Sequence, residues 1–311
     1  MTILIIGLGS IAQKHIYAIR KLYPNCKIYA LRSQEKHISK IEGVINVFNI
    51  EEIEEKVYCV LITNPTSLHS EAIKKSLNLN VPLLIEKPLF DKVVENIKLV
   101  DYINSRNITT YIACNMRFHP AIMFLKKYLE ENICEINEVN VYCGSFLPDW
   151  RKVEDYKKSY SANPKLGGGV HLDLIHEIDY IFWLFGKPKN VNSVKRNVST
   201  LDISAFDFAS YTLEYPKFCA NLILNYYRKF AKRNIELVLS NDILNIDLIK
   251  CTVINSRNEI IFSNNNYNIL ETYNNQIEYF FNCIDNTSLP MNDINESFEI
   301  LKIALHEEVR K

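Results

Sequence analysis

The first third of the chain alternates short apolar runs with helical patterns, and this alternation constrains the fold more than any other feature. Apolar runs of strand length occupy residues 2–6, 27–31, 57–62, 82–85 and 109–114. Amphipathic helical patterns lie between them at residues 11–21, 68–77 and 93–104. Because strands that alternate with helices form βαβ units with right-handed crossovers, the sequence predicts a parallel sheet covered by helices.

A glycine turn joins the first apolar run to the first helix and reads Gly7-Leu8-Gly9-Ser10-Ile11-Ala12. In a dinucleotide loop the first glycine makes the tight turn and the second lets the backbone approach a pyrophosphate. The third small residue packs the helix on the strand, and the helix N-terminus attracts the anion. We therefore predict cofactor contacts from Gly7, Gly9, Ser10, Ile11 and Ala12. The alternative is a structural glycine turn in another α/β fold.

The end of the second strand bears on the choice of cofactor. In NAD-specific proteins a carboxylate at this point binds the ribose 2′-OH. Here the strand ends Ala30-Leu31-Arg32-Ser33, without a carboxylate. Arg32 and Ser33 can hold a 2′-phosphate, so the sequence predicts NADP or NAD with NADP preferred. A solvated arginine after a strand is the alternative.

After Pro120 the pattern changes from alternating elements to strands in series. A helix fits residues 121–131 and a strand fits 138–144. Further β-like runs follow at residues 191–198, 206–214, 218–226, 235–239 and 243–248, and helices close the chain near 274–283 and 294–309. Glu214-Tyr215-Pro216-Lys217 reads as a hairpin turn, and Asp293 with Glu296 forms a capping-box pattern. Consecutive strands favour an antiparallel sheet, so we predict an α/β domain at 1–118 and an α+β domain at 119–311.

Composition argues against several classes of partner, although a local basic patch stays possible. Lys plus Arg and Asp plus Glu are both 36, so no net field favours nucleic acid or an anionic membrane. Apolar runs such as residues 180–185 are far shorter than the roughly 20 residues that a membrane span needs, and the N-terminus reads as a strand. The eight cysteines are scattered with no C-x-x-C pair. Free thiols in a reducing compartment explain them best, and we predict a cytoplasmic protein.

Three glycines at 167–169 precede a helical pattern that carries Asp173 and His176. Glycine lets a backbone approach a neighbour closely, and residues three apart on a helix share one face. The pair could be a metal site, a proton relay or a buried structural contact. His171 and Asp173 would point to different helix faces, and no distant Cys/His cluster completes a ligand set, so we predict no metal.

A further motif, Ile85-Glu86-Lys87-Pro88-Leu89, follows the fourth strand, where open α/β sheets bind ligands. Together with Gly7-x-Gly9-x-x-Ala12, Asn64-Pro65-Thr66-x-x-His69 and the 167–176 segment, it resembles the glucose–fructose oxidoreductase / inositol dehydrogenase / rhizopine-catabolism (Gfo/Idh/MocA) family. The resemblance runs from residue 1 to the last helix. It implies an N-terminal Rossmann domain with a parallel sheet and a C-terminal α+β domain with an open, mainly antiparallel sheet. It also implies a homo-oligomer, a dimer or tetramer, assembled through that sheet.

Members of this family usually move a hydride between a nicotinamide and a carbon of a sugar or cyclitol. The resemblance makes Lys87 the acid/base, His176 a second catalytic group and Asp173 a contact for substrate hydroxyls. Cofactor contacts are implied for Asn64, Pro65, Thr66, His69, Glu86 and Asn115. A lysine that is partly desolvated beside a cationic nicotinamide loses its proton more readily, which suits this role. In many members the histidine follows the aspartate by four residues, whereas the spacing here is three.

Two segments are candidates for the substrate side. By resemblance, the Arg117-Phe118-His119-Pro120 stretch lies near substrate, although a packed junction explains Phe118 and His119 equally well. In the loop from Ser145 to Tyr160, the aromatic side chains could stack on a sugar or base while the basic ones meet an anion. The predicted substrate contacts are Arg117, Trp150, Arg151, Tyr156 and Tyr160. The pattern of this loop resembles family members of bacterial surface-glycan and nonulosonic-acid metabolism; a solvated charged loop is the alternative.

The sequence thus predicts an NADP-preferring oxidoreductase that acts on an anionic or nucleotide-activated sugar derivative, with no nucleic-acid or membrane partner. Two rivals remain. One is an NAD-dependent glycosidase or lyase that oxidises and re-reduces its substrate on a bound cofactor. The other is a non-enzymatic regulator that binds a dinucleotide.

Overall fold

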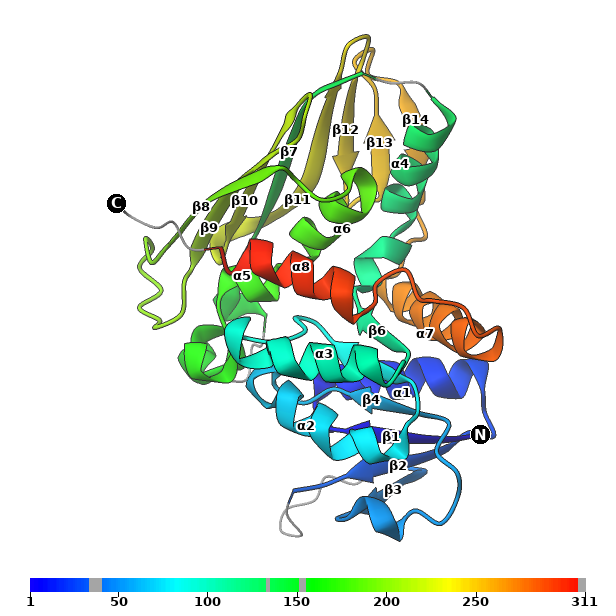
Figure 1. Cartoon of the computed structure of the whole chain (residues 1–311). Helices are drawn as coiled ribbons and strands as arrows, with labels where there is room; N and C mark the ends of the chain where they lie inside the picture. The colour runs from blue at the N-terminus through cyan, green and yellow to red at the C-terminus, as the bar shows by residue number, and fades with distance from the viewer. Residues whose placement is uncertain (34–40, 133–134, 151–154, 307–311) are drawn as a thin grey trace. The chain divides into compact units, whose positions relative to one another are not determined.

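The computed structural model describes residues 1–33, 41–132, 135–150 and 155–306 (Figure 1). Its internal contacts divide the chain into two compact units. Unit 1 comprises Met1–Asn115 and Ile269–Glu299, and unit 2 comprises Met116–Asn268 and Ile300–Lys311. Each unit is built on its own sheet.

Unit 1 contains a six-stranded sheet of order β3-β2-β1-β4-β5-β6 in which every neighbouring pair is parallel. The strands are β1 (Thr2–Ile6), β2 (Lys27–Leu31), β3 (Val44–Val47), β4 (Cys59–Ile62), β5 (Leu83–Glu86) and β6 (Thr110–Ala113). This order is that of the doubly wound dinucleotide-binding fold. β1 is buried along its whole length, as expected of a central parallel strand covered on both faces. The predicted parallel Rossmann sheet is confirmed.

Three helices of unit 1 correspond to the predicted ones: α1 (Ser10–Leu22), α2 (His69–Ser76) and α3 (Ile97–Ser105). α1 buries one face, which includes Ala12, His15 and Ile19. α3 begins later than predicted, because a short 3-10 helix occupies Val94–Asn96. The prediction missed β3, a four-residue strand at the sheet edge that is only partly buried and so lacks an apolar run.

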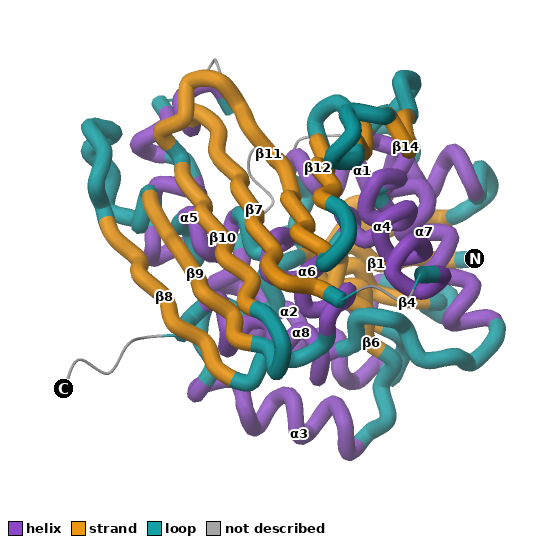
Figure 2. Tube along the Cα trace, turned by 90° about the horizontal axis from the view of Figure 1, so that it is seen from above, coloured by secondary structure: helices purple, strands orange, loops and turns teal. Residues whose placement is uncertain are grey.

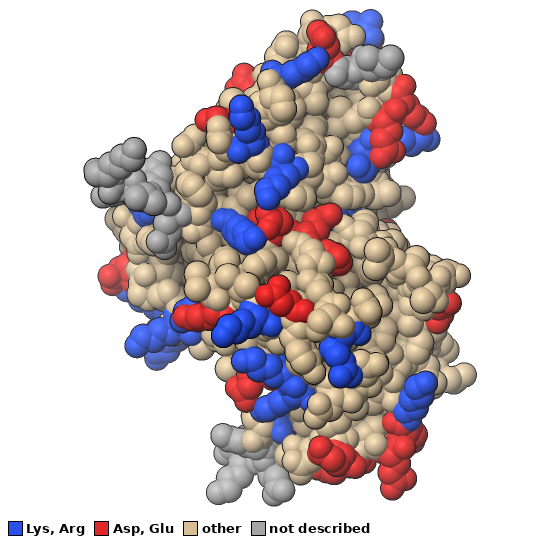
Figure 3. Space-filling model, in the orientation of Figure 1, with Lys and Arg blue, Asp and Glu red and all other residues tan. Residues whose placement is uncertain are grey.

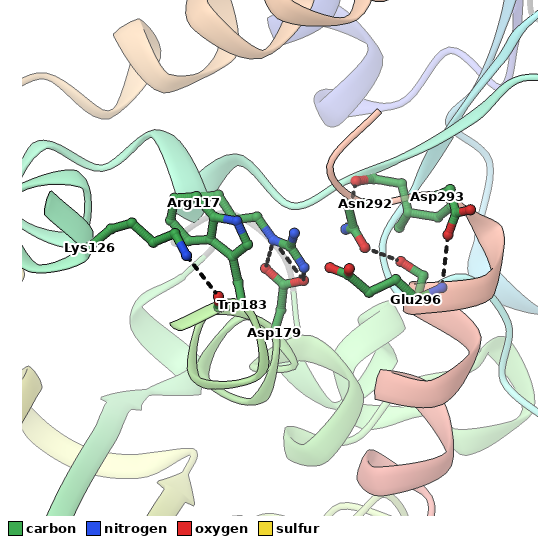
Figure 4. A network of polar contacts seen from close by, with 9 residues as sticks. Arg117, Lys126, Asp179, Trp183, Asn292, Asp293 and Glu296 are labelled. Carbon is green, nitrogen blue, oxygen red and sulfur yellow. Dashed lines mark hydrogen bonds and ion pairs between the residues drawn. The ribbon is translucent and has the colours of Figure 1, made fainter. Parts of the chain in front are cut away.

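The closing helices differ from the predicted domain division. α7 (Ile269–Asp285) and most of α8 (Ile294–Ala304) group with unit 1, whereas the sequence placed them in the second domain, 119–311. Phe281 of α7 packs on Tyr23 and Tyr58, with ring centroids 5.0 and 5.4 Å away. An amphipathic pattern shows that a helix has a buried face but does not show which sheet covers it. The predicted cap of α8 is present, since Asp293 Oδ1 accepts the Glu296 N–H at 2.9 Å (Figure 4), but α8 ends at Ala304, short of 309.

Unit 2 contains an eight-stranded sheet of order β14-β13-β12-β11-β7-β10-β9-β8. Its strands are β7 (Ile136–Phe146), β8 (Asn190–Arg196), β9 (Phe208–Glu214), β10 (Cys219–Asn225), β11 (Tyr227–Leu239), β12 (Ile243–Asp247), β13 (Thr252–Ile254) and β14 (Ile260–Ser263). Only β7 and β10 pair in parallel among the described strands of this sheet, so the predicted mainly antiparallel sheet is confirmed. The β9–β10 turn closes as predicted, with Tyr215 N–H donating to Phe218 O at 2.9 Å.

One face of this sheet forms the core of unit 2. Ala209, Tyr211 and Leu213 of β9 are buried, whereas Ser210 and Thr212 between them are partly exposed. The same alternation continues through β10. The remaining helices of unit 2 are α4 (Pro120–Glu131), α5 (Val170–Asp173) and α6 (His176–Phe185). In Figure 2 the strands run side by side from β8 to β12, with the opposite, partly exposed face toward the viewer.

Basic and acidic side chains are interspersed on the face of the molecule shown in Figure 3. Neither sign gathers into a large patch over that face. Within the described residues, no helix combines the length and apolarity that crossing a bilayer requires.

Candidate active site

The glycine turn after β1 has the geometry that a dinucleotide loop needs. Gly7 has φ +95°, and a Cβ built on it would lie 2.5 Å from the backbone nitrogen of Asn64. Glycine is therefore required by conformation and by close approach. A Cβ on Gly9 would meet only open space, and Gly9 and Ser10 are exposed where α1 begins with Ser10 and Ile11. Ala12 is buried in the third small position.

A cavity of about 790 Å³ opens beside this turn, at the carboxyl ends of β1, β2 and β4. Of the residues that the sequence predicts to bind cofactor, Gly7, Arg32, Ser33, Asn64 and Pro65 line it together. Its charged lining is mixed and consists of Arg32, Lys75, Glu51 and Glu71. Lys75 and Glu71 form an ion pair of 2.7 Å. The cavity has the size of a small-molecule site and lies where open α/β sheets bind ligands.

His69 and Thr66 are buried near this cavity but do not line it. The buried His69 ring lies between two carbonyl oxygens, with Nδ1 3.0 Å from Leu89 O and Nε2 3.0 Å from Asn64 O. It thus ties the loop after β4 to the loop after β5, and its burial lowers the pKa of its imidazole. Thr66 is also buried, at the start of a 3-10 helix. The contacts of His69 hold the two loops together, and the cofactor contacts predicted for His69 and Thr66 stay predictions.

The Glu86-Lys87-Pro88 motif lies at the end of β5. The buried Glu86 carboxylate has Oε1 2.6 Å from His15 Nε2, and its Oε2 accepts the Lys87 N–H at 3.2 Å. Glu86 is not among the residues that line the cavity, and its carboxylate contacts His15 and the Lys87 backbone. Lys87 is half-buried, and its peptide bond to Pro88 is cis. The sequence did not indicate a role for His15, although this residue lies on the buried face of α1 three residues after Ala12.

Asn115 is buried and donates from Nδ2 to Thr272 Oγ1 of α7 at 2.7 Å. The sequence predicts a cofactor contact for this residue. The structure instead directs its amide toward α7, so its visible contact is structural.

The glycine-rich segment of unit 2 departs from the sequence prediction. Asp173 is the last residue of α5 and His176 is the first of α6, so the predicted single helix is wrong. The Ile175 N–H bonds to Leu172 O rather than to the residue four back, and Leu174 has φ −98° and ψ +30°. This tightened turn interrupts the helical register. The expectation that Asp173 and His176 share one helix face therefore does not apply.

The glycines of this segment are needed because other atoms of the chain lie against them. A Cβ on Gly168 would lie 2.1 Å from Tyr160 O, and one on Gly169, where φ is +129°, would lie 2.8 Å from the His171 ring. His171 packs edge-on against Phe206 at 5.6 Å, and burial lowers its pKa to about 3. His171 is thus a neutral core residue.

Asp173 belongs to a buried polar contact that the sequence did not reveal. The Tyr226 hydroxyl, fully buried between β10 and β11, donates to Asp173 Oδ2 at 2.5 Å. Burial raises the pKa of Tyr226, and the Asp173 carboxylate adds to the effect. Trp150 packs edge-on against Tyr226 at 5.3 Å and donates from Nε1 to Ser145 Oγ at 2.8 Å. Two predicted site residues, Asp173 and Trp150, therefore meet through Tyr226.

His176 is half-buried at the start of α6, beside a buried ion pair. Glu177 Oε1 accepts from Arg233 Nε of β11 at 2.6 Å, and the Glu177 side chain is fully buried. This pair attaches the first turn of α6 to the sheet. Neither residue was singled out from the sequence, because nothing local marks a contact between positions 56 residues apart.

Arg117, which the sequence predicts as a substrate contact, is fully buried in unit 2. Its fully buried guanidinium donates from Nε and Nη2 to the Asp179 carboxylate, the shortest distance being 2.7 Å, and lies over the Trp183 ring (Figure 4). A buried arginine side chain with a carboxylate partner serves packing. We therefore assign Arg117 to the core of unit 2.

The loop after β7 is a series of short 3-10 helices: Leu147–Asp149, Tyr156–Lys158, Tyr160–Ala162 and Pro164–Leu166. Tyr156 donates its hydroxyl to Leu201 O at 3.0 Å, and Tyr160 donates to Gly167 O at 2.8 Å. Trp150 is 40% exposed and remains the accessible aromatic candidate of the three. The predicted contact at Arg151 lies outside the described residues.

No cluster of three His, Cys, Asp or Glu side chains suited to a metal ion occurs in the part of the chain that the structure describes. Each unit thus holds its own group of candidate residues. Unit 1 has the cavity and the Glu86-Lys87-Pro88 motif, and unit 2 has the Asp173–Tyr226–Trp150 cluster and His176.

Three named relatives come from sequence comparison. Levoglucosan dehydrogenase of Pseudarthrobacter phenanthrenivorans is 29% identical over 140 residues, which are 44% of this chain and 35% of that protein. scyllo-Inositol 2-dehydrogenase (NADP(+)) of Bacillus subtilis is 26% identical over 226 residues, 69% of this chain and 59% of that protein. 2,7-Anhydro-N-acetylneuraminate hydratase of Escherichia coli is 21% identical over 200 residues, 63% of this chain and 52% of that protein. The matches therefore span between 35% and 59% of the relatives' own lengths.

The fold and the family models agree. A solved structure of levoglucosan dehydrogenase with NADH and levoglucosan superposes with a TM-score of 0.84 at 15% identity, covering 98% of this chain and 95% of that one. The family model described as "Oxidoreductase family, NAD-binding Rossmann fold" matches residues 1–113, and the model of the family's C-terminal domain matches residues 125–243. The two models, in domain order on this fold, show that the chain belongs to the Gfo/Idh/MocA family of oxidoreductases.

Proposed function

We propose that this protein is an NAD(P)-dependent dehydrogenase or reductase that acts on a CH–OH group of a sugar derivative. The observation that carries the proposal is the cavity at the ends of β1, β2 and β4, where Gly7 and Asn64 approach so closely that no side chain fits between them. Gly7, Gly9 and the exposed N-terminus of α1 would hold the pyrophosphate. Asn64 and Pro65 would bound the cofactor on the opposite side.

The reaction needs one proton transfer for each hydride transfer. The bound nicotinamide supplies the hydride acceptor or donor at C4. Lys87 takes the hydroxyl proton during oxidation and returns it during reduction. Its backbone N–H donates to Glu86 Oε2, which fixes the peptide of Lys87 at the end of β5. Asp173, held by Tyr226, would accept hydrogen bonds from substrate hydroxyls, and His176 would be a second polar group on the substrate.

The sugar is proposed to be anionic or nucleotide-activated, as in surface-glycan or nonulosonic-acid metabolism. Trp150 supports this class, because an exposed indole is a platform for a sugar or base. The printed names of the relatives, which refer to levoglucosan, scyllo-inositol and an anhydro-neuraminate, support a carbohydrate in general. The described cysteines are all free, which supports the predicted reducing, cytoplasmic location.

NADP preference is proposed on Arg32 and Ser33, which line the cavity after β2. Glu51 and Glu71 oppose this preference in the same lining, so it needs its own test. We expect NADPH to raise the melting temperature more than NADH at equal concentration, since stabilisation grows with ligand concentration over Kd. Arg32→Ala should remove that difference while preserving the response to NADH. Equal responses of the parent protein to both cofactors would contradict the preference.

A second function is favoured by one comparison. The E. coli relative is named as a hydratase, which is compatible with a reaction that oxidises and re-reduces its substrate without net use of cofactor. The cases are separated by two incubations, one with NADPH and a panel of keto-sugars and one with NAD+ or NADP+ and the corresponding hydroxyl sugars, each followed by absorbance and by product analysis. Steady cofactor loss supports the dehydrogenase or reductase, and product without net cofactor change supports transient redox chemistry. Binding without any product supports a regulator.

The role of Lys87 is tested by Lys87→Ala. We expect turnover to fall by roughly two to four orders of magnitude while the cofactor-induced melting shift persists, because a positioned acid/base contributes a factor of that size. Lys98→Ala on the exposed surface of α3 is the matched control and should retain full activity. Full turnover by Lys87→Ala would exclude the proposed mechanism.

A further inference from the structure

A buried histidine of α1 contacts the motif that carries Lys87. His15 is fully buried, and its Nε2 lies 2.6 Å from Oε1 of Glu86. The two residues are 71 positions apart, so the contact joins the first helix of unit 1 to the end of β5. Oε2 of the same carboxylate accepts the backbone N–H of Lys87 at 3.2 Å. One carboxylate therefore connects a core imidazole to the peptide of Lys87.

The protonation of the pair follows from its surroundings. Among the described residues, His15 Nδ1 is buried without a hydrogen-bond partner. A buried lone pair without a donor raises the free energy of the folded state less than a buried N–H without an acceptor. The proton of neutral His15 is therefore placed on Nε2. In this tautomer His15 Nε2 donates to the Glu86 carboxylate. A charge-assisted hydrogen bond of this kind is short and directional, and it fixes the rotamer of the carboxylate.

The imidazole is itself held by a second element. Tyr273 of α7 packs edge-on against it at 5.8 Å, and Lys14 Nζ lies 5.0 Å from the centroid of the same Tyr273 ring. His15 therefore has little freedom to move away from Glu86. A chain of contacts thus connects Tyr273 of α7 to His15 of α1, His15 to Glu86, and Glu86 to the backbone of Lys87.

We infer that His15 is a positioning residue for Lys87, acting through Glu86. The inference rests on the proposed function, because it requires Lys87 to be the acid/base. An active-site group displaced by about 1 Å can lose a hundredfold in rate. The donor on His15 prevents such a displacement by keeping the Glu86 carboxylate under the Lys87 peptide.

The test compares two replacements of His15. His15→Phe keeps a planar ring but removes the donor, whereas His15→Gln retains an N–H donor. We expect His15→Phe to lower kcat roughly tenfold to a hundredfold with little change in the KM for cofactor. His15→Gln should restore much of that loss. Ile19→Val, a small change at another buried position of α1, is the matched control for loosened packing and should retain its kcat.

Glu86→Gln provides the second arm. If His15 acts through Glu86, His15→Phe should lower kcat much less in the Glu86→Gln background than in the parent protein. A merely structural role predicts lower stability, independent effects of the two changes and no rescue by glutamine. If His15→Phe does not fold, His15→Gln and Glu86→Gln with their double variant decide the same question.

Two outcomes overturn different claims. A parental kcat in folded His15→Phe, with Lys87→Ala inactive, would contradict the positioning role and leave the proposed function intact. Full turnover by Lys87→Ala would remove the proposed function itself. The cofactor-induced melting shift of each variant shows that the protein is folded and binds.

Discussion

At the scale of single residues, His119 shows how a buried ring acquires a fixed protonation state. It caps α4, with Nδ1 accepting the Ala121 N–H at 3.2 Å and Nε2 facing Leu248 O at 2.9 Å. These partners require the neutral ring with its proton on Nε2, because a proton on Nδ1 would face an N–H group. Burial lowers the pKa of His119 to about 4, and the positive charge of Arg233 acts in the same direction.

This state predicts how stability depends on pH. An unfolded histidine has a pKa near 6.5. Between about pH 6.5 and 4, His119 is therefore protonated in the unfolded chain but neutral in the native protein. The contribution of neutral His119 is complete above about pH 6.5 and is lost as the pH falls toward 4. His119→Asn keeps a capping acceptor but does not titrate. We expect it to flatten the slope of unfolding free energy against pH by up to about 1.4 kcal/mol per pH unit.

Urea unfolding of both proteins at pH 7, 6 and 5 measures the effect. His69 and His171 titrate with the same sign in both proteins, so the difference between parent and variant isolates His119. A difference that is constant with pH would contradict the prediction.

Gly7 and Gly9 make a second prediction, because they are glycines for different reasons. Gly7→Ala places a methyl group against the Asn64 backbone at positive φ, so it should destabilise the protein without cofactor by about 1–2 kcal/mol or more. Gly9→Ala meets open space and should leave that stability unchanged while weakening cofactor binding. Melting temperatures without cofactor and Kd values for NADPH separate the two effects. Equal stability losses for both variants would show that this distinction is wrong.

At the scale of elements, local patterns located most helices and strands but not their interruptions. The limits of β1 and β2 were predicted to the residue, since each is a short apolar run bounded by polar or glycine residues. β13 and β14 were missed, because strands of three and four residues carry too few residues for an alternating pattern. The break between α5 and α6 was also missed. Leu174 and Ile175 are ordinary helix residues, and both are buried here by tertiary packing.

The packing of α6 gives a third prediction, which concerns Arg117 and Asp179. Both side chains are fully buried, and Lys126 lies on the same Trp183 ring at 5.1 Å (Figure 4). Removing one partner leaves an uncompensated buried charge, so Arg117→Met should lower the unfolding free energy by about 3–5 kcal/mol. Adding Asp179→Leu should recover most of that loss, because a pair of apolar side chains needs no compensation.

Chemical denaturation measures these changes, and Lys126→Met, at the partly exposed cation on the same ring, is the matched control with a small expected effect. An Arg117→Met protein of parental stability with a raised KM for substrate would instead restore the substrate contact predicted from the sequence.

At the scale of the whole molecule, the sequence predicted candidate site residues in each unit but not the side chains that contact them. Gly7, Asn64, Pro65, Arg32 and Ser33 were predicted separately and line one cavity, because a parallel sheet brings the ends of β1, β2 and β4 to one edge. The partners His15, Tyr226 and Arg233 were not predicted. Each reaches its carboxylate across 53 to 71 residues, and no local pattern specifies such a pairing.

The outer face of the unit 2 sheet leads to the last prediction. We define this outer face by Asn140, Tyr142, Thr212, Asn221 and Ile223, whose side chains alternate with the buried ones. Some polar groups on this side of the sheet pair with one another: Thr212 Oγ1 donates to Asn221 Oδ1 at 3.1 Å, and Asn225 Nδ2 donates to the Tyr142 hydroxyl at 2.7 Å. Polar groups that already pair within the face need no partner from a second copy, so burying them in an interface costs little.

We therefore expect the protein to be a dimer or tetramer assembled through the outer face. Ile223 of the outer face is 39% exposed. Ile223→Arg would place like charges opposite each other in a symmetric interface and should yield monomers. Val94→Arg, at a more exposed apolar position of unit 1, is the matched control and should keep the parental mass. Light scattering coupled to size-exclusion chromatography measures the mass of each. A parental oligomer that survives Ile223→Arg would place the interface elsewhere, and a monomeric parent would remove the prediction altogether.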